Sequence, residues 1–461
     1  MEEKMVDVVV IGGGAGGVPA AIRAAQLGGR VTIIESRDLG GQCMNRGCVP
    51  YGHMMEASSI LGTLALGKEM GISIPEVSKD YAALMDRQNK LLGFMKQGVK
   101  STLLKKKIEI IEGKGEITAK GTVAVNGKKI TCKAIILATG ATWVKPDFTG
   151  ADLEDVLNTD YLLTAKVLPA RVLLSGRSPW LVGIAQFLQR YGTQAILATP
   201  EKRILFNENK TIATRLAKVL RDDGIDVRTR SEVLSISKKK GGLQVDLKSK
   251  DDVEKISVDK VITLDRRASV DGLGLKHVGL DEKGEFISVN EKMETQAQGV
   301  YAIGDLTGSP ENHYSHRASQ QGIIAAENAM GADTAFRKGT LTRVLFTRPQ
   351  VACVGLTEKE AKDAGHDVVV GAAPLSMNTY GMIISESEGL VEVVADKSYG
   401  EILGVHFIGK AASEMAGQAL LAIEMEATLD ALASMAFPHP TLSESLAEAA
   451  RNALGRHIYL P

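Results

Sequence analysis

The beginning of the chain carries the feature that most restricts its fold. A largely β-branched run, Val6–Ile11, which is apolar except for Asp7, leads into the glycine-rich sequence GGGAGG and then into PAAIRAAQLG. The run VTIIE at 31–35 again has the composition of a buried strand. A strand, a tight glycine turn, a helix and a second strand make a βαβ unit, and strands that are apolar throughout belong to a parallel sheet covered on both faces. The sequence therefore predicts an α/β fold.

The glycine turn also has the spacing of a dinucleotide-binding loop. Gly12 permits the turn, Gly14 lets the backbone approach a pyrophosphate at the positive end of the helix, and Gly17 allows close helix packing. Glu35, which ends the second strand, can accept hydrogen bonds from a ribose diol. The alternative is a tight glycine turn that binds no ligand.

Length and later segments indicate more than one domain. A chain of 461 residues is too long for one ordinary core, so two to three domains are expected. A second βαβ pattern begins near Arg171–Leu174, and a strand at VYAIGD returns to the first domain. From about Lys338 strands and helices alternate in a third domain. The basic run Lys238–Lys240 precedes two glycines between strand-like segments, which favours a hairpin turn over a nucleic-acid site.

The charge balance argues against polyanionic partners. The chain has 55 basic and 55 acidic residues and no net charge, so we expect neither nucleic-acid binding nor attraction to an anionic membrane. The start enters a strand almost at once, without room for a cleavable leader, and no apolar stretch approaches membrane-spanning length. We therefore expect a cytoplasmic protein without membrane insertion, where a disulfide is usually catalytic.

Two of the four cysteines stand close together in GGQCMNRGCVP. At the start of a helix, Cys43 and Cys48 would lie about one turn apart and could form a disulfide, and a helix N-terminus would stabilise a thiolate. A metal half-site is the alternative, but the sequence has no second CxxC or Cys/His pair to complete it, so no metal is expected. Cys132 and Cys353 lie in apolar strand-like runs and are expected to be buried and inert.

Near the other end of the chain, His439 and Glu444 lie in FPHPTLSE. A histidine within reach of a carboxylate is a candidate general base, because the partner sets its tautomer and pKa. Considered alone, such a histidine is more often structural.

Together these segments make the chain resemble the class I pyridine nucleotide–disulfide oxidoreductases, and among them the dihydrolipoamide dehydrogenases most closely. The motifs fall in the family's order from end to end: GGGAGG with Glu35, GGQCMNRGCVP, LATG at 137–140, YAIGD at 301–305, FTRPQVACVGLTEKEA at 346–361 and HPTLSE at 439–444. The resemblance implies an FAD domain at 1–150 and 271–337, a NAD(P)-type domain at 151–270 and a C-terminal α+β dimerisation domain at 338–461.

The resemblance also implies roles for the site residues. FAD is held by the first glycine loop, by Glu35 and by Asp305, which reaches the ribityl chain. The further cofactor-binding positions that it implies are Gly41, Gly115, Thr139, Gly140 and Ala318. Cys48 lies against the isoalloxazine as the charge-transfer thiol, and Cys43 is the interchange thiol that meets the substrate. His439, oriented by Glu444, comes from the partner subunit of a homodimer. The cysteine pair near the C-terminus that marks mercuric reductases is missing from the ending GRHIYLP.

Departures from the family cluster in the second nucleotide loop, which reads GRSPWLVG. Ser178 and Leu181 stand where the second and third glycines belong, and Gly183 replaces an acidic residue. A side chain near phosphate, bulk at the close-packing position and the missing N–H of Pro179 all weaken an anion cradle. The ribose-binding acid is replaced by Thr199. A glycine of a later turn is Asp265, and Lys202 or Arg203 offers only a weak 2′-phosphate site.

A coupled loss occurs beside the cysteines. The family has Pro-Ser-Lys after the second cysteine, and that lysine pairs with the acid replaced by Gly183, whereas this chain has Pro50-Tyr51-Gly52. Losing both charges is tolerable, whereas losing one would leave the other buried and unpaired. The expectation is an intact flavin and disulfide half-reaction with doubtful NAD(P) use; atypical backbone binding of NAD(P) is the alternative. The role of Trp180 stays open between a gate and a packing residue.

The expected activity is therefore two-electron exchange between a dithiol, the Cys43–Cys48 disulfide and FAD. A dihydrolipoyl group on a carrier protein is the leading substrate, and a glutathione-like disulfide or another small dithiol is the second choice. Another class of function is a flavin-binding electron-transfer subunit of a redox complex that does not use free NAD(P)H. A third is a structural relic, in which the cysteines carry no electrons.

Overall fold

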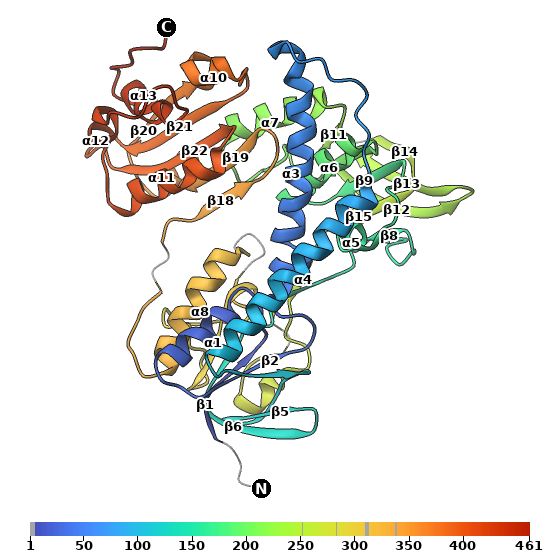
Figure 1. Cartoon of the computed structure of the whole chain (residues 1–461), viewed down its shortest axis with the longest axis vertical. Helices are drawn as coiled ribbons and strands as arrows, with labels where there is room; N and C mark the ends of the chain where they lie inside the picture. The colour runs from blue at the N-terminus through green and yellow to red at the C-terminus, as the bar shows by residue number, and fades with distance from the viewer. Residues whose placement is uncertain (1–4, 251, 283, 309–312, 337–338) are drawn as a thin grey trace.

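The computed structural model describes residues 5–461 except 251, 283, 309–312 and 337–338; of Lys68 only the backbone is described. The expectation about the start of the chain concerns residues 1–4 in part, and the expected domain boundary at 337/338 also lies outside the described residues. Two parallel sheets, each with an antiparallel extension or partner sheet, and one antiparallel sheet organise the chain (Figure 1). The α/β class expected from the sequence is confirmed.

The first sheet is assembled from both flanks of the chain. Its parallel part has the order β3-β2-β1-β6 with β17 beside β6, and β5 and β4 continue it in antiparallel pairing. The first-flank elements of this part are β1 (Val6–Ile11), α1 (Gly17–Gln26), β2 (Val31–Glu35), α2 (Gly41–Arg46), α3 (Cys48–Ala65), η1 (Leu66–Met70), α4 (Tyr81–Lys105), β3 (Glu109–Glu112), β4 (Glu116–Ala119), β5 (Thr122–Val125), β6 (Lys128–Leu137) and β7 (Ala141–Trp143). The returning elements are β16 (Arg266–Ala268), which pairs with β7 in a separate two-stranded sheet, η2 (Leu275–Val278), β17 (Val300–Ala302), η3 (Gly304–Leu306) and α8 (Ser315–Ala329). Helices α1 and α8 pack together on this sheet (Figure 1).

The second sheet repeats the βαβ pattern in the middle of the chain. Its five parallel strands have the order β11-β10-β9-β15-β8, and β12, β13 and β14 form a separate antiparallel sheet. The elements are β8 (Val156–Leu157), α5 (Tyr161–Thr164), β9 (Arg171–Ser175), α6 (Pro179–Tyr191), β10 (Gln194–Thr199), α7 (Lys210–Asp222), β11 (Asp226–Thr229), β12 (Ser231–Lys239), β13 (Gly242–Ser249), β14 (Asp252–Val258) and β15 (Lys260–Thr263). The hairpin expected at Lys238–Lys240 is present, because Lys239 pairs with Gly242.

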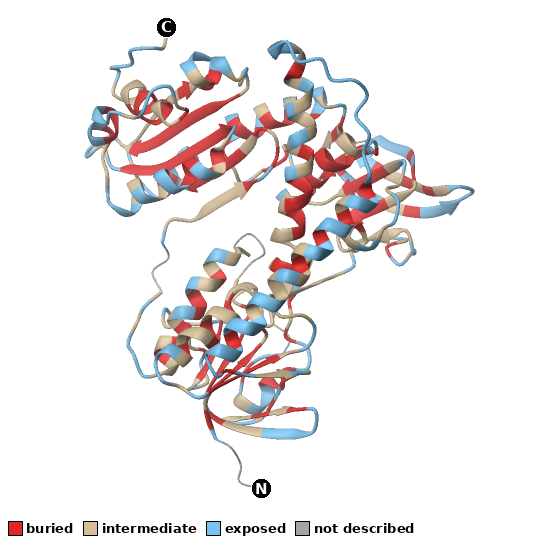
Figure 2. Cartoon of the chain, in the orientation of Figure 1, coloured by how far each residue is buried: buried red, intermediate tan, exposed pale blue. Residues whose placement is uncertain are grey.

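The third sheet is antiparallel, with the order β18-β19-β22-β21-β20, and α11 and α13 pack on its strands (Figure 1). Its elements are β18 (Thr342–Leu345), β19 (Gln350–Gly355), α9 (Glu358–Asp363), β20 (Val368–Pro374), η5 (Leu375–Met377), α10 (Thr379–Ile383), β21 (Leu390–Asp396), β22 (Ile402–Gly409), α11 (Ala412–Glu424), α12 (Leu429–Ser434) and α13 (Glu444–Ala453). Strands β21 and β22 are almost wholly buried, as the red ribbons of Figure 2 show.

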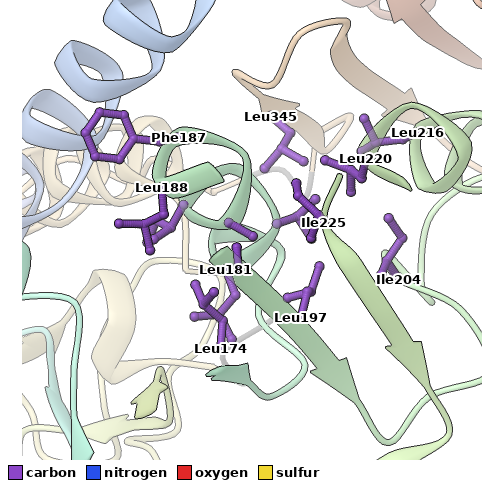
Figure 3. Packing of buried hydrophobic residues seen from close by; sticks show 14 of the residues in the cluster. Leu174, Leu181, Phe187, Leu188, Leu197, Ile204, Leu216, Leu220, Ile225 and Leu345 are labelled. Carbon is purple, nitrogen blue, oxygen red and sulfur yellow. The ribbon is translucent and has the colours of Figure 1, made fainter. Parts of the chain in front are cut away.

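Packing of apolar side chains joins the middle of the chain to the C-terminal sheet. One cluster combines side chains of α3, α6 and α7 with Leu345 of β18 and Val351 of β19. Figure 3 shows Leu345 near Leu216 and Leu220 of α7. Burial of each such side chain stabilises the fold by about 1.5–3 kcal/mol. Among the described residues, no helix is both long and apolar enough to cross a membrane.

Candidate functional site

A cavity of about 1850 Å³ opens where the first and second sheets and the C-terminal part meet. The carboxyl end of β1, the starts of α2, α3 and α8, and the turn before α6 contribute to its wall. Ligands of doubly wound α/β proteins bind outside the carboxyl ends of the strands, so this is where a dinucleotide is expected. Of the predicted cofactor-binding residues, all except Gly17 line the cavity.

The glycines of the first loop are required by close backbone contacts. Gly12 has φ +107°, and a Cβ there would lie 2.3 Å from the carbonyl oxygen of Ala138. A Cβ at Gly17 would lie 1.9 Å from the carbonyl oxygen of Gly12, which agrees with its expected packing role. Gly41 has φ +59°, and its Cβ would lie 2.6 Å from the Cα of Gly14. The loop is therefore a backbone-lined cradle at the N-terminus of α1, and these residues fit the pyrophosphate of FAD.

Glu35 is held in place at the end of β2. Its Oε2 accepts a hydrogen bond of 2.6 Å from the Gly13 N–H, and its Oε1 accepts one of 2.8 Å from the Arg37 N–H. The carboxylate is thus tied to the glycine loop and lines the cavity, where its remaining lone pairs suit a ribose diol. The ribose contact of Glu35 stays a prediction, and the sequence did not indicate this bond to the loop.

The far wall of the cradle joins the two flanks of the chain. The Thr139 hydroxyl donates to the carbonyl oxygen of Ser269 at 2.8 Å, and the Ser269 N–H donates to the carbonyl oxygen of Gly140 at 2.8 Å. A Cβ on Gly115 would lie 3.1 Å from Ile11, so this position is tightly packed. Ala318 is buried in α8 behind the loop.

Asp305 takes part in a charged cluster that the sequence did not reveal. Its carboxylate accepts a hydrogen bond of 2.8 Å from Arg266, and the Arg266 guanidinium lies 5.0 Å from the ring centroid of Trp143. Nδ1 of His313 lies 3.8 Å from the same carboxylate, and burial lowers the pKa of that imidazole. The Arg266 Nε is buried and has no hydrogen-bond partner within the described part of the chain. A cofactor with polar oxygens fits this wall.

The two cysteines lie on two successive helices, a short one and a long one, and not together at the start of a single helix. Cys43 is in α2, Cys48 is the first residue of α3, and Gly47 between them has φ −126° and ψ −113°, which interrupts the helix. The expectation of a single helix was wrong. The backbone of Gly47 lies outside the helical region, so the chain changes direction there and a second helix begins at Cys48. The break brings the thiols into hydrogen-bond contact, and both are free thiols lining the cavity.

The first ionisation of the pair belongs to Cys43. Its hydrogen bond with Cys48 lowers the pKa of Cys43 to about 7, against the opposing effect of burial, and Ser315 lowers it further. The same hydrogen bond and burial raise the pKa of Cys48. Cys43 is therefore the more nucleophilic thiol near neutral pH, as an interchange thiol must be.

Ser315 is a site residue that sequence reasoning missed. Its Oγ lies 3.2 Å from Sγ of Cys48, with hydrogen-bond geometry, at the first residue of α8. The two residues are separated by 267 positions, so no local spacing could have indicated the contact.

His439 and Glu444 form the expected pair in the C-terminal part. Nδ1 of His439 lies 2.9 Å from Oε1 of Glu444, and the Thr441 N–H donates to Oε2 at 2.8 Å. Glu444 begins α13 and fixes the ring so that Nε2 faces away from it. The imidazole side chain is 64% exposed and does not line the cavity of its own chain. The structure therefore does not bring His439 to the cysteines within one subunit.

The remaining cysteines are buried as expected. Burial raises the pKa of Cys132 to about 11 and that of Cys353 well above its ordinary value, so neither thiol ionises readily. In the part of the chain that the structure describes, no group of three or more His, Cys, Asp or Glu side chains is arranged to hold a metal ion.

A glycine cradle for a dinucleotide and a paired thiol at the same cavity define the class of flavoprotein disulfide oxidoreductases. Residues 6–330 match the pyridine nucleotide-disulphide oxidoreductase family, and residues 341–450 match the dimerisation domain of that family. The chain belongs to the pyridine nucleotide-disulphide oxidoreductases, whose cofactor is FAD, and is similar to their dihydrolipoyl dehydrogenases.

Several relatives extend over nearly the whole chain. A dihydrolipoyl dehydrogenase of Thermus scotoductus is 37% identical over 97% of each chain, and one of Bacillus subtilis is 32% identical over 98% of this chain and 99% of its own. The solved Cu(II) complex of the HOCl-induced flavoprotein disulfide reductase RclA from Escherichia coli has a TM-score of 0.86 at 22% identity, with 97% and 99% of the two chains covered. This last likeness shows the shared fold.

Proposed function

We propose that the chain oxidises a dihydrolipoyl-type dithiol, or reduces the corresponding disulfide, at Cys43 and Cys48. The observation that carries the proposal is the pair of free thiols, Cys43 and Cys48, at the wall of the glycine-lined cavity, where the interaction with Cys48 lowers the pKa of Cys43. The dihydrolipoyl substrate class comes from the names of the similar enzymes of Thermus scotoductus and Bacillus subtilis. A carrier protein that bears a lipoyl group is the proposed partner.

The two cysteines carry out the reaction by thiol–disulfide exchange with the substrate. One thiolate of the substrate attacks Sγ of Cys43 in the disulfide form, breaks the bond to Cys48 and leaves Cys48 as the thiolate. The second substrate thiolate then attacks the mixed disulfide and releases the oxidised substrate, so two electrons remain on the cysteines. FAD, when bound, accepts these two electrons. The first cradle is proposed to hold it through Gly12, Gly14, Glu35 and Asp305.

The substrate proton is proposed to pass to Nε2 of His439 from the partner subunit. The exposed His439–Glu444 pair supports this arrangement, since it is oriented for a base and lies outside the cavity of its own chain. The match to the family's dimerisation domain supports a homodimer. In a two-fold dimer each site would combine the cysteines of one chain with the histidine of the other.

Two experiments test the proposal. Anaerobic dihydrolipoamide should bleach the flavin absorbance of the purified protein but not that of Cys43→Ser; equal bleaching in both would refute the role of the cysteines. Coexpression of Cys43→Ser and His439→Gln chains should restore about a quarter of the wild-type turnover, because half of randomly formed dimers have one complete site. Turnover no higher than in either homodimer would refute the shared site.

A further inference from the structure

The turn before α6 stands where a second dinucleotide would bind, because it joins β9 to α6 in a parallel βαβ unit with β10. Gly176 keeps a φ of +145°, but Leu181 is fully buried beneath the turn, and a Cβ on Gly176 would lie 3.3 Å from its side chain. Pro179 occupies the first position of α6, where a proline suits a helix but donates no hydrogen bond to an anion.

Internal contacts use the charged groups beside this turn. Nε of Arg177 donates to Glu201 just after β10 at 2.8 Å, so the carboxylate near the ribose position is already paired. Arg203 donates to the carbonyl oxygens of Phe206 and Glu208 at 2.6 and 3.1 Å. One terminal nitrogen of Arg203 is thus used within the chain, and a 2′-phosphate contact at Lys202 or Arg203 stays a prediction.

Tyr51 fills space between α3 and α6 beside this turn. It lies on α3 three residues after Cys48, about one helical turn away, and α3 packs on α6. The ring of Tyr51 meets the ring of Trp180 edge-on, with centroids 4.5 Å apart and planes at 61°. Both side chains line the large cavity, and Tyr51 is only 6% exposed.

Gly183 makes room for the phenol. A Cβ at Gly183 would lie 2.0 Å from the Tyr51 Oη, so any larger residue at position 183 would displace the Tyr51 ring. Tyr51 belongs to the same apolar cluster as Leu181, Phe187 and Leu188, which Figure 3 shows around α6. The ring is therefore a packed part of the core and not a mobile surface group.

We propose that Tyr51, seated over Gly183 and backed by Trp180, determines coenzyme specificity by excluding the nicotinamide of NADH and NADPH from the part of the cavity beside α6. The inference rests on the proposed dithiol function. It deepens that function because electrons then enter from dithiols and not from a nicotinamide dinucleotide.

The test compares anaerobic reduction of the bound flavin by NADH, NADPH and dihydrolipoamide. We expect dihydrolipoamide to reduce the wild-type flavin and both nucleotides to fail, whereas Tyr51→Ala and Trp180→Ala should be reduced by a nucleotide at least about tenfold faster than wild type. Tyr51→Phe is the matched control; it keeps the ring and should stay as slow with nucleotides as wild type. Calorimetric titration with NADH gives a second readout that needs no turnover.

Each outcome decides the inference. Rapid nucleotide reduction of the wild type would overturn it, and so would variants that are as slow as wild type while they retain flavin and a cooperative thermal transition. If Tyr51→Ala fails to fold, Trp180→Ala decides, because its half-buried ring is less demanding to remove. Failure of dihydrolipoamide alone would sink the proposed function, yet the comparison of nucleotide rates would still decide the role of Tyr51.

Discussion

Removing the Ser315 hydroxyl should make Cys43 a weaker nucleophile at neutral pH. The hydroxyl lies 3.2 Å from Sγ of Cys48 and also lowers the pKa of Cys43. A hydrogen bond to a charged group contributes about 1.5–3 kcal/mol, and one pKa unit corresponds to about 1.36 kcal/mol. The hydroxyl interacts with the sulfurs of both cysteines, and water can partly replace it. We therefore expect Ser315→Ala to raise the pKa of Cys43 by only about one unit.

The assay is the pH dependence of alkylation of the reduced protein, with mass spectrometry to assign the label to Cys43 or Cys48. The wild-type rate should rise with pH through a midpoint near the pKa of about 7, since only the thiolate reacts. The midpoint should move upward in Ser315→Ala and stay in place in Ser59→Ala, which lies about three turns along α3 from Cys48. An unchanged midpoint in Ser315→Ala would refute the reasoning.

Three further changes test the cradle, the base and the C-terminal core. Gly12→Ala should abolish flavin retention, measured as flavin absorbance per protein, because its Cβ would lie 2.3 Å from a carbonyl oxygen; full flavin content would contradict this. His439→Gln should slow dithiol oxidation about 100-fold in stopped flow, and a loss below about tenfold would speak against a general base. Burial lowers the pKa of His406 to about 4. Between about pH 6.5 and about pH 4 this histidine is therefore protonated in the unfolded chain but not in the folded chain, so stability should fall as the pH drops through this range. Denaturant titrations should show a smaller fall in His406→Gln, whereas the exposed His277→Gln should keep the wild-type fall.

Local chemistry explains which parts of the site could be predicted from the sequence. Gly17 lies against the carbonyl oxygen of Gly12 within one βαβ unit, so the spacing of the two glycines alone indicated the cradle, whereas the contact of Gly12 with Ala138 joins distant strands. His439 and Glu444 are five residues apart, and their contact is likewise local. In contrast, Ser315 meets Cys48, and Arg266 meets Asp305, only because distant segments return to the same cavity. No periodicity in the sequence carries that information.

Tyr51 and Gly183 lie between these two cases. The sequence indicated that the lysine lost within Pro50-Tyr51-Gly52 and the acid lost at Gly183 belonged to one charge pair, but it did not indicate a contact between Tyr51 and Gly183. It could not show that the phenol fills the volume left by the missing side chain, because that depends on the packing of α3 against α6. In the structure the Tyr51 phenol occupies the space beside Gly183, and this filled space is what we propose to exclude the nicotinamide.

Burial of the Tyr51 hydroxyl has a free-energy cost that can be measured. The Tyr51 Oη is buried without a hydrogen-bond partner among the described side chains and backbone, and burial raises the pKa of the phenol. A buried polar group without a partner costs about 1–3 kcal/mol, so Tyr51→Phe should leave the free energy of unfolding of the flavin-free protein unchanged or raise it by about 1 kcal/mol. Denaturant unfolding of the flavin-free and flavin-loaded forms would measure this difference. A loss of more than about 1 kcal/mol in the flavin-free form would mean that the hydroxyl has a protein partner, which contradicts its unpartnered position in the structure. A loss of unfolding free energy confined to the flavin-loaded form would instead indicate a hydrogen bond from the hydroxyl to the cofactor. Tyr51 would then also be a cofactor ligand.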